Sequence, residues 1–550
     1  MKKKRVSVIG IILLIIVIIA AGGFWYWNTY KKRIIRSELE KAITEKSGGL
    51  YKVHYGNLEL DEVNGHLSVS SFTLTYDSIK YLQLKKEQRA PHLLFTISIP
   101  EIQITGVETP RALIDKEISG RHLAIINPVI EIIYTNAGKD SSRHLPDKEI
   151  YEQILGNLNL IKLDSVTISG AEITTKNLAD GKTLVHFLNT SVSLIKVKVD
   201  SAGGADTTRL LFAKEINLDC EKFTWHSQDM LYNYQVDSLA LRSAISTVSI
   251  KNFFILPQLK ENDFVKKFSH QIDRFDFAIH NIQLKNTDLN QLSDEMIQAD
   301  TLVIGSASFK IYRDRNFPED KKSKVGAYPQ QLIQKIPFQI EIKKAIVKNA
   351  NIVYKEKSSV THQSGKVQFG NLSAYISNIT NRKESIADNN QMVVDMQGYL
   401  LNKIPLSSKW IFYLGNPDGK FNLSGKGGGT DAAIFNVLTI PMGPAQFKTG
   451  HINSLEFNLA GTNHQMDGNV KLLYDDIHVS MLKKEEDSVH FKKRRMMSLF
   501  ANMKIKNFNP EKDKSPRIAG VHYRRDIHKS IFNLVWKSIF EGIQEIGGIK

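Results

Sequence analysis

Close to its start the chain has an uncharged, apolar stretch of 25 residues, Val6 to Tyr30, and most of the remaining sequence has the pattern of short β-strands. A bilayer core needs about 20 apolar residues in a helix, so this stretch is long enough to span a membrane. It ends in aromatic residues, which favour the membrane–water interface. The anchor residues that we predict are Ile9, Ile12, Leu14, Ile16, Ile19, Trp25 and Trp27. The sequence therefore predicts a large β-rich body tethered to a membrane.

The flanks of this stretch bear on its orientation. Basic residues stand on both sides, at 2–5 and at 31–36, so the positive-inside rule is nearly balanced. The free amine and the later Glu38 and Glu40 favour an N-terminus on the inner side. A cleaved signal peptide is the alternative, but the apolar core is longer than the roughly 7–15 residues of a signal sequence. We expect an uncleaved, single-pass anchor.

The charge and the cysteine content of the chain indicate which kinds of partner it suits. Cys220 is its one cysteine, so there is no intrachain disulfide. The net charge is +16, and residues 481–550 supply +8 of it, with 16 Lys/Arg against 8 Asp/Glu. A basic end on a tethered protein suits anionic lipid headgroups better than nucleic acid, and a solvated basic tail explains it equally well. We predict a membrane partner and no nucleic acid.

Apolar and polar residues alternate with a period of two after residue 50, which is typical of half-buried strands. A weak repeat, apolar-x-x-apolar-x-apolar-x-(Gly/Asn), recurs within this pattern. Its copies run from Ile99 to Gly106, Leu163 to Gly170, Ile245 to Asn252, Ile279 to Asn286 and Ile342 to Asn349. The two-residue gap shifts the apolar face by one position. We therefore expect a bulge or corner at each gap and a left-handed backbone at the Gly or Asn, although an all-β chain yields some such matches by chance.

The pattern changes near the C-terminus. We expect a strand to end at Leu423, a glycine-rich turn over 424–429, and a helix from Thr430 that stops at Pro441. Further strands are predicted over residues 452–459, 468–474 and 477–482, with Asp475-Asp476 as the turn between the last two.

A last helix is predicted over residues 526–546, with a narrow polar stripe and a broad apolar surface. We expect this apolar surface to pack against the end of the sheet. Contact with a membrane or a partner is the more specific alternative. The candidate contact residues are Phe532, Trp536 and Phe540.

No group of residues indicates catalysis. The glycine run lacks the Gly-Lys-Ser/Thr ending of a P-loop, because Gly429 passes directly to Thr430. The 16 histidines are scattered, without H-E-x-x-H spacing, and there is no G-x-S-x-G elbow. We predict no catalytic residue, no metal ligand and no cofactor, hence a protein that is not an enzyme. A hydrolase built from distant residues is the weakest alternative.

An antiparallel sheet must cover one face, and residues 50–420 offer few helices to cover it. A closed barrel or sandwich is one solution, and a curved sheet whose apolar face is filled by lipid tails is another. The predicted fold class is mainly β: a transmembrane helix, an extended, curved, groove-like antiparallel sheet with few short helices, and a C-terminal amphipathic helix. Some twenty strands would extend on the order of 90 Å. The predicted groove residues are Ile97, Ile99, Leu163, Val166, Ile250, Phe277, Ile279, Ile340 and Ile342.

Several stretches carry a resemblance to a known family. They are the anchor with its short helix, then residues 58–74, residues 124–139, and the pair 450–462 and 466–479. Over most of its length the chain resembles the AsmA-like proteins of Gram-negative bacteria. The resemblance implies an inner-membrane tether, a periplasmic β-groove related to bridge-like lipid-transfer proteins, and a role in outer-membrane lipid homeostasis. It brings no catalytic residues.

Five segments are predicted. Residues 1–30 form the cytoplasmic tip and anchor, 31–49 a juxtamembrane helix, 50–423 the β-groove body, 424–485 an AsmA-like β segment, and 486–550 a basic tail with its helix. We expect the body to bind or conduct phospholipid or another envelope lipid. The alternative is a non-enzymatic assembly or scaffolding factor for outer-membrane proteins, with a dry core and a docking patch for an envelope protein partner.

Overall fold

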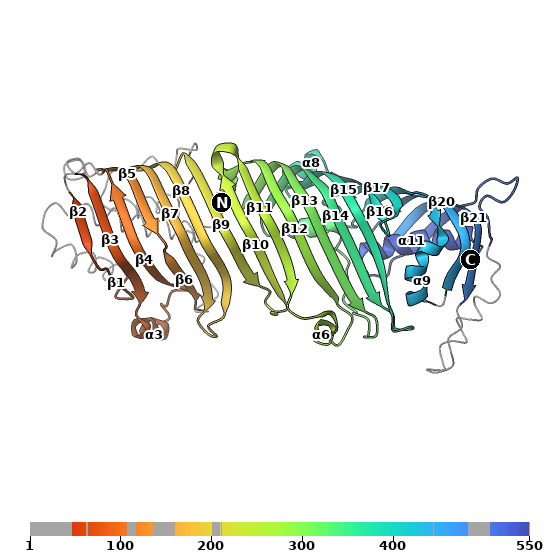
Figure 1. Ribbon diagram of the computed structural model, residues 1–550, viewed down its shortest axis with the longest axis horizontal. Coiled ribbons are helices and arrows are strands. Elements are labelled where there is room, and N and C mark those ends of the chain that lie inside the picture. The colour runs from red at the N-terminus through yellow and green to blue at the C-terminus, as the bar shows by residue number, and fades with distance from the viewer. Residues whose placement is uncertain are drawn as a thin grey trace. The chain divides into compact units, whose positions relative to one another are not determined.

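The structure is a computed structural model, and it describes residues 47–61, 64–106, 117–135, 160–200, 209–210, 212–443, 445–481 and 506–548. The predicted anchor and nearly all of the predicted juxtamembrane helix lie outside the described residues. Within them, strands dominate and helices are few and short, which confirms the mainly β class (Figure 1). None of the described helices is both long and apolar enough to cross a bilayer.

The chain divides into two compact units. The first unit comprises residues 1–253 and 283–298, and the second comprises residues 254–282 and 299–550. The division falls within three long strands, β11 (Thr247–Pro257), β12 (Asp273–Thr287) and β13 (Met296–Asp314).

The first unit is built mainly from antiparallel neighbours. Its strands are β1 (Tyr51–His54), β2 (Leu58–Asp61), β3 (His66–Tyr76), β4 (Leu93–Thr105), β5 (Glu117–Ile126), β6 (Val129–Tyr134), β7 (Leu160–Asn177), β8 (Thr183–Asp200), β9 (Glu215–His226) and β10 (Tyr232–Arg242). Its helices are α3 (Ser78–Lys86), η1 (Ser243–Ile245) and η2 (Leu289–Asp294). The strands alternate buried apolar with exposed polar side chains, so one face of the sheet carries the core.

Our prediction of a purely antiparallel sheet is wrong at one place. β5 and β6 both pair parallel with β7, while each also pairs antiparallel with β4. Asn127, with φ +50°, and Pro128 separate β5 from β6. A parallel pair needs a long crossover connection, and residues 135–159 between β6 and β7 provide the necessary length.

Left-handed residues interrupt the strands close to where the repeat predicts them. Gly106, Gly170 and Asn286 end three of the repeat copies with φ values of +68°, +65° and +51°, as predicted. Asn252 and Asn349 end the other two copies within strands and do not have a positive φ, so the prediction is wrong there.

The two-residue gaps of the repeat also coincide with left-handed residues. Ser246 and Asn281 lie inside the gaps of their own copies, with φ +50° and +55°. In the other three copies the left-handed residue lies on the neighbouring strand, opposite the gap. These residues are Ser71, Lys196 and Asn378. The face shift seen in the sequence is therefore a kink shared by two paired strands.

The second unit continues with antiparallel neighbours. Its strands are β14 (Gln339–Lys357), β15 (Ser364–Thr380), β16 (Gln391–Leu400), β17 (Ile404–Tyr413), β18 (Phe421–Gly427), β19 (Thr430–Asp431), β20 (Ala445–Gly461), β21 (Gln465–Met481) and β22 (Ile518–Arg524). Its helices are α6 (Glu261–Val265), α7 (Pro329–Ile333), α8 (Lys383–Asp388), η3 (Ala432–Phe435), α9 (Asn436–Met442) and α11 (Ile531–Ile546).

Two predicted turns of this unit are strands instead. β18 does not end at Leu423 but continues to Gly427, because residues 424–427 pair with β17 on one side and β20 on the other. The ring of Phe457 covers Gly425, where a Cβ would lie 2.3 Å from the ring. Asp475 and Asp476 lie within β21, where Asp476 has φ +53° and the register with β20 shifts nearby. A bulge thus replaces the expected turn.

The two predicted C-terminal helices are present with altered limits. The first begins at Ala432 as a 3₁₀ turn, and α9 contains Pro441 in its last turn instead of stopping before it. α11 begins at Ile531, not at Asp526, because Ser530 is extended and its Oγ accepts a hydrogen bond from the Asn533 amide at 3.4 Å. α11 packs on β21 and β22, which agrees with the favoured explanation of its apolar surface.

Candidate lipid-binding surface

Four of the predicted groove residues lie in the core of the first unit. Ile97, Ile99, Leu163 and Val166 are 0–5% exposed and belong to one apolar cluster that crosses β3 to β9. Protein already covers these side chains, so an open surface in this unit must lie elsewhere on the apolar face.

The open part of that face carries a ladder of aromatic rings that sequence analysis did not single out. Phe187 of β8 stacks on Phe223 of β9, and Trp225 of β9 stacks on Phe223 and on Tyr234 of β10, with ring centroids 5.0–5.3 Å apart. Phe253 lies 6.3 Å from Trp225. All five rings are half-buried. The Phe-Thr-Trp alternation of β9 is the sequence signal that could have revealed them.

The ladder belongs to the apolar face. Phe187 pairs across strands with Ile173, which packs against the buried cluster of the first unit. Residues directly opposite each other in a sheet point to the same side. The rings therefore extend the buried apolar face into a region where it is partly exposed.

The second unit presents a comparable surface on β12, β13 and β14. Phe277 meets Phe309 edge to face at 4.9 Å, and Phe275 lies 5.4 Å from Phe277 with 36% of its surface exposed. The predicted groove residue Ile279 packs beside Phe309 against a small buried cluster of Ala307, Ala350 and Leu372. The three other predicted groove residues are separate from this group: Ile250 and Ile340 are half-buried, and Ile342 is buried.

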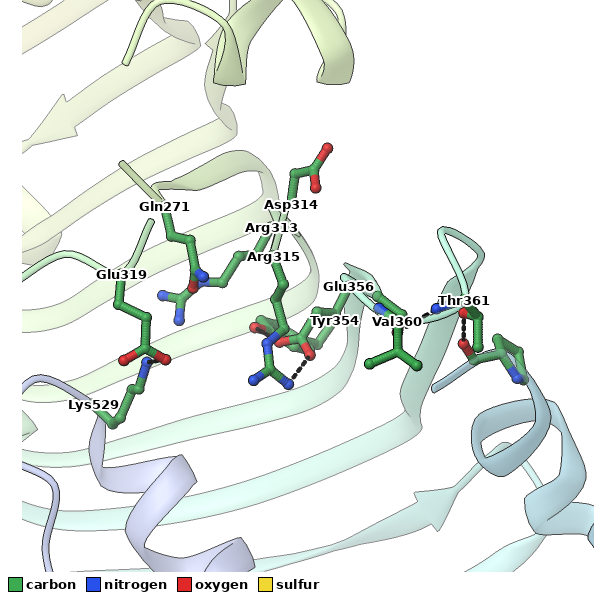
Figure 2. Close-up of polar contacts among 12 residues, drawn as sticks. Gln271, Arg313, Asp314, Arg315, Glu319, Tyr354, Glu356, Val360, Thr361 and Lys529 are labelled. Atoms are coloured by element: carbon green, nitrogen blue, oxygen red, sulfur yellow. Dashed lines mark hydrogen bonds and ion pairs between the residues drawn. The ribbon is translucent and has the colours of Figure 1, made fainter. Parts of the chain in front are cut away.

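Polar and charged residues end this apolar strip on the same face. Asp273 stands two positions before Phe275 on β12, Arg313 four positions after Phe309 on β13, and Tyr354 two positions after Ile352 on β14. Even spacing places each of them on the face of the apolar residue in its strand. We call Asp273, Arg313, Arg315, Tyr354 and Glu356 the polar rim, and Figure 2 labels the last four of these residues.

The rim is held by charge-assisted hydrogen bonds. The Arg313 guanidinium donates through Nε and Nη2 to both carboxylate oxygens of Asp273, at 2.7 and 2.6 Å. The Tyr354 hydroxyl donates to Glu356 at 2.8 Å, and Arg315 donates to the other oxygen of Glu356 at 3.3 Å. Burial raises the pKa of the Tyr354 hydroxyl, which therefore stays a donor at neutral pH.

Lys324 lies near the rim and forms no ion pair with the described residues. Burial lowers the pKa of the Lys324 ammonium; the charge of Asp273 opposes this shift, and the charge of Arg313 adds to it. In the described part of the chain, no carboxylate forms an ion pair with Lys324, whereas Lys529 pairs with Glu319 at 2.7 Å (Figure 2). The Lys324 ammonium is therefore available to an anionic group at the end of the apolar strip.

The outward face of α11 is a second apolar surface. Phe532, Trp536 and Phe540 are 68%, 53% and 38% exposed, and the last two rings stack with centroids 5.8 Å apart. The side chains of Ile531, Leu534 and Ile539 point the other way and are buried against the sheet. The three predicted contact residues thus stand together on the free side of the helix.

The described residues hold no cluster of three or more His, Cys, Asp and Glu that would bind a metal ion. His122 lies between two hydroxyls, Ser165 Oγ at 2.8 Å and Thr167 Oγ1 at 3.2 Å, rather than beside the carboxylate that orients a triad histidine. The Cys220 thiol is buried, and burial raises its pKa, which disfavours the reactive thiolate.

The sequence matches no family model, and a search of curated proteins also found no match.

Proposed function

We propose that the protein binds lipid acyl chains on the apolar faces of its two units, holds polar headgroups at the polar rim, and serves as a membrane-anchored carrier of envelope lipid. One observation supports this most: the partly exposed strip of Phe275, Phe277 and Phe309 ends, on the same face, in Arg313 and Tyr354. An apolar strip with a charged end matches the two parts of an amphiphile.

The energetics favour an aliphatic occupant. Apolar surface left in water costs about 25 cal/mol per Å² relative to burial, and soluble proteins seldom expose large contiguous apolar patches without a use for them. Acyl chains make non-directional contacts, so they suit a flat surface of rings and branched side chains. The headgroup would meet Lys324 and the arginines of the rim.

The test is site-specific photo-crosslinking of the full chain in cells. Benzoylphenylalanine replaces Phe309 on the apolar face or, as the matched control, its exposed neighbour Lys310 on the opposite face. Phospholipid should be recovered as a covalent adduct from the position 309 protein and be nearly absent from the position 310 protein. Equal labelling at both positions, or no lipid at 309, would contradict the proposal.

The second candidate is a non-enzymatic scaffold for envelope assembly, which the closely packed core of the first unit favours. The substitution Ile279→Asp separates the two functions. For a lipid-binding surface we expect lost lipid adducts with folding retained, because a carboxylate on an open face stays hydrated. In a dry core the unpaired charge should unfold the protein instead. Circular dichroism alongside the crosslinking distinguishes these results.

A further inference from the structure

The opposite, polar face of the second unit is hollowed. A cavity of about 1240 Å³ opens across β14 to β22, eight adjacent strands if the short β19 is left out. At about 4.8 Å per strand it extends roughly 30 Å. We call this cavity the polar trough: side chains of the polar face line it along its length, together with intervening residues such as Val347, Ala374, Met396 and Phe457.

Two cross-strand rows form the walls of the polar trough. In each row, every residue pairs directly with the next one on the adjacent strand. The first row is Ser373, Gln397, Ser407, Lys426, Glu456, Lys471 and Ile518. The second row is Ile346, Tyr375, Asp395, Lys409, Ser424, Asn458 and Asn469.

Hydroxyls, amides and ammonium groups predominate in the rows at a constant spacing, with one carboxylate in each row and an isoleucine at one end of each. The side chains of Ser373, Gln397, Ser407, Asn458 and Asn469 form no hydrogen bond with the described residues, so their donors and acceptors are free for a ligand. Free polar groups at a regular spacing suit a ligand built from repeating units, each of which presents the same polar groups.

The charge of the polar trough is positive. It contains Lys348, Lys409, Lys426 and Lys471 against Asp395 and Glu456, four cations and two anions. The pairs among them are long: Lys426 and Lys471 share Glu456 at 3.4 and 3.8 Å, and Lys409 is 4.0 Å from Asp395. Such half-exposed pairs are weak and exchange readily for an anionic ligand.

We propose that the polar trough binds an extended, acidic oligosaccharide. Its hydroxyls match the free amides and hydroxyls of the two rows, its acid groups match the lysines, and Tyr375, 48% exposed near one end, offers a ring face to a sugar. One sugar ring is about as long as the spacing between strands, so successive sugars meet successive strands. An acyl chain would leave these polar groups unpaired, so this site is independent of the proposed lipid surface.

The test is calorimetric titration of the full chain with short oligouronates, with neutral malto-oligosaccharides of the same length as the comparison. We expect binding of the oligouronates. The double substitution Lys409→Gln with Lys426→Gln should weaken it roughly tenfold. Lys383→Gln with Lys403→Gln removes the same charge from exposed positions outside the trough and should leave the affinity unchanged.

A neutral variant separates recognition from simple charge attraction. Asn458→Leu keeps the net charge and should weaken oligouronate binding at least threefold, because one row loses an amide. The proposal is overturned by absent oligouronate binding, by equal losses in the two lysine pairs, or by an unchanged Asn458→Leu variant. Lysine-dependent binding of anionic phospholipid vesicles without any oligouronate binding would identify a membrane surface in its place. Unchanged thermal unfolding of each variant shows that the fold is intact.

Discussion

Among single residues, Arg525 holds together three parts of the second unit. It is 8% exposed, and its guanidinium lies 4.4 Å from the ring of Tyr328. It donates hydrogen bonds to backbone carbonyls of Asn463, Lys324 and Lys529, at 3.2, 2.9 and 3.2 Å. In the described part of the chain no carboxylate pairs with it, so carbonyl dipoles and the ring face stabilise this buried charge.

Replacing Arg525 should therefore be costly. We expect Arg525→Ala to lower the free energy of unfolding by about 2–4 kcal/mol, because it removes several charge-assisted hydrogen bonds and the ring contact. Arg524→Ala, at the exposed neighbouring position, is the matched control and should change stability little. Urea unfolding of both variants measures the difference in the free energy of unfolding. Equal stabilities would show that the contacts of Arg525 do not stabilise the second unit.

Tyr328 predicts how stability responds to alkaline pH. Burial raises the pKa of its hydroxyl to about 12, while Arg525 opposes the rise. Because tyrosinate is disfavoured in the fold, the folded protein keeps a proton that the unfolded chain loses near pH 10. This stabilising contribution is complete below pH 10 and is lost as the pH rises toward 12.

We expect the Tm of the unaltered protein to fall more steeply between pH 10 and 12 than that of Tyr328→Phe, which has no proton to lose at this position. At neutral pH the variant should be slightly less stable, because the hydroxyl donates to the Thr462 carbonyl at 2.9 Å. Thermal scans at several pH values measure both effects. Parallel Tm curves above pH 10 would contradict the assignment.

At the scale of elements, α11 approaches its sheet through a glycine. A Cβ on Gly542 would lie 2.7 Å from Cβ of Val470 and 2.9 Å from its Cγ2. Gly542→Ala gains about 1 kcal/mol of helix propensity but overpacks a contact that typically costs about 1–3 kcal/mol. We expect net destabilisation in urea, whereas Gly520→Ala on β22, with open space around it, should be tolerated.

The free side of α11 leads to a second prediction for this element. Replacing Phe532, Trp536 and Phe540 together by serine should leave the free energy of unfolding nearly unchanged, because all three are exposed. If this side contacts a membrane, co-sedimentation with anionic vesicles should fall several-fold, since buried aromatic surface drives interfacial binding. Unchanged co-sedimentation would point to a protein partner or to no contact.

The helices and strands themselves were predicted with uneven success. Alternation in residues 468–482 identified two strands, yet a bulge at Asp476 joins them into β21. Gly425 suggested a turn, but the ring of Phe457 on a neighbouring strand turns the glycine into a packing position. In both cases the deciding contact is with a residue on another strand, which no local pattern contains.

At the scale of the whole molecule, we predict that the N-terminal apolar stretch anchors the protein in a membrane. Residues 1–30 lie outside the described part of the chain, so the anchor stays a prediction. The full chain should remain in the membrane fraction after alkaline carbonate extraction. A variant that combines Ile12→Lys, Leu14→Lys and Ile16→Lys should not, because three charges in the middle of the apolar stretch oppose its insertion. Extraction of the unaltered chain would contradict the anchor.

The sequence by itself determined the mainly β class, the sites of several strand kinks and the amphipathic character of α11. These features depend on side-chain periodicity along one segment. The tertiary structure decided which apolar residues are covered and which stay open. It also decided the parallel pairing of β5 and β6 with β7, the placing of Arg525, and the two rows of the polar trough. Each of these depends on the register between paired strands or on contacts between separate segments, and the local sequence does not specify those partners.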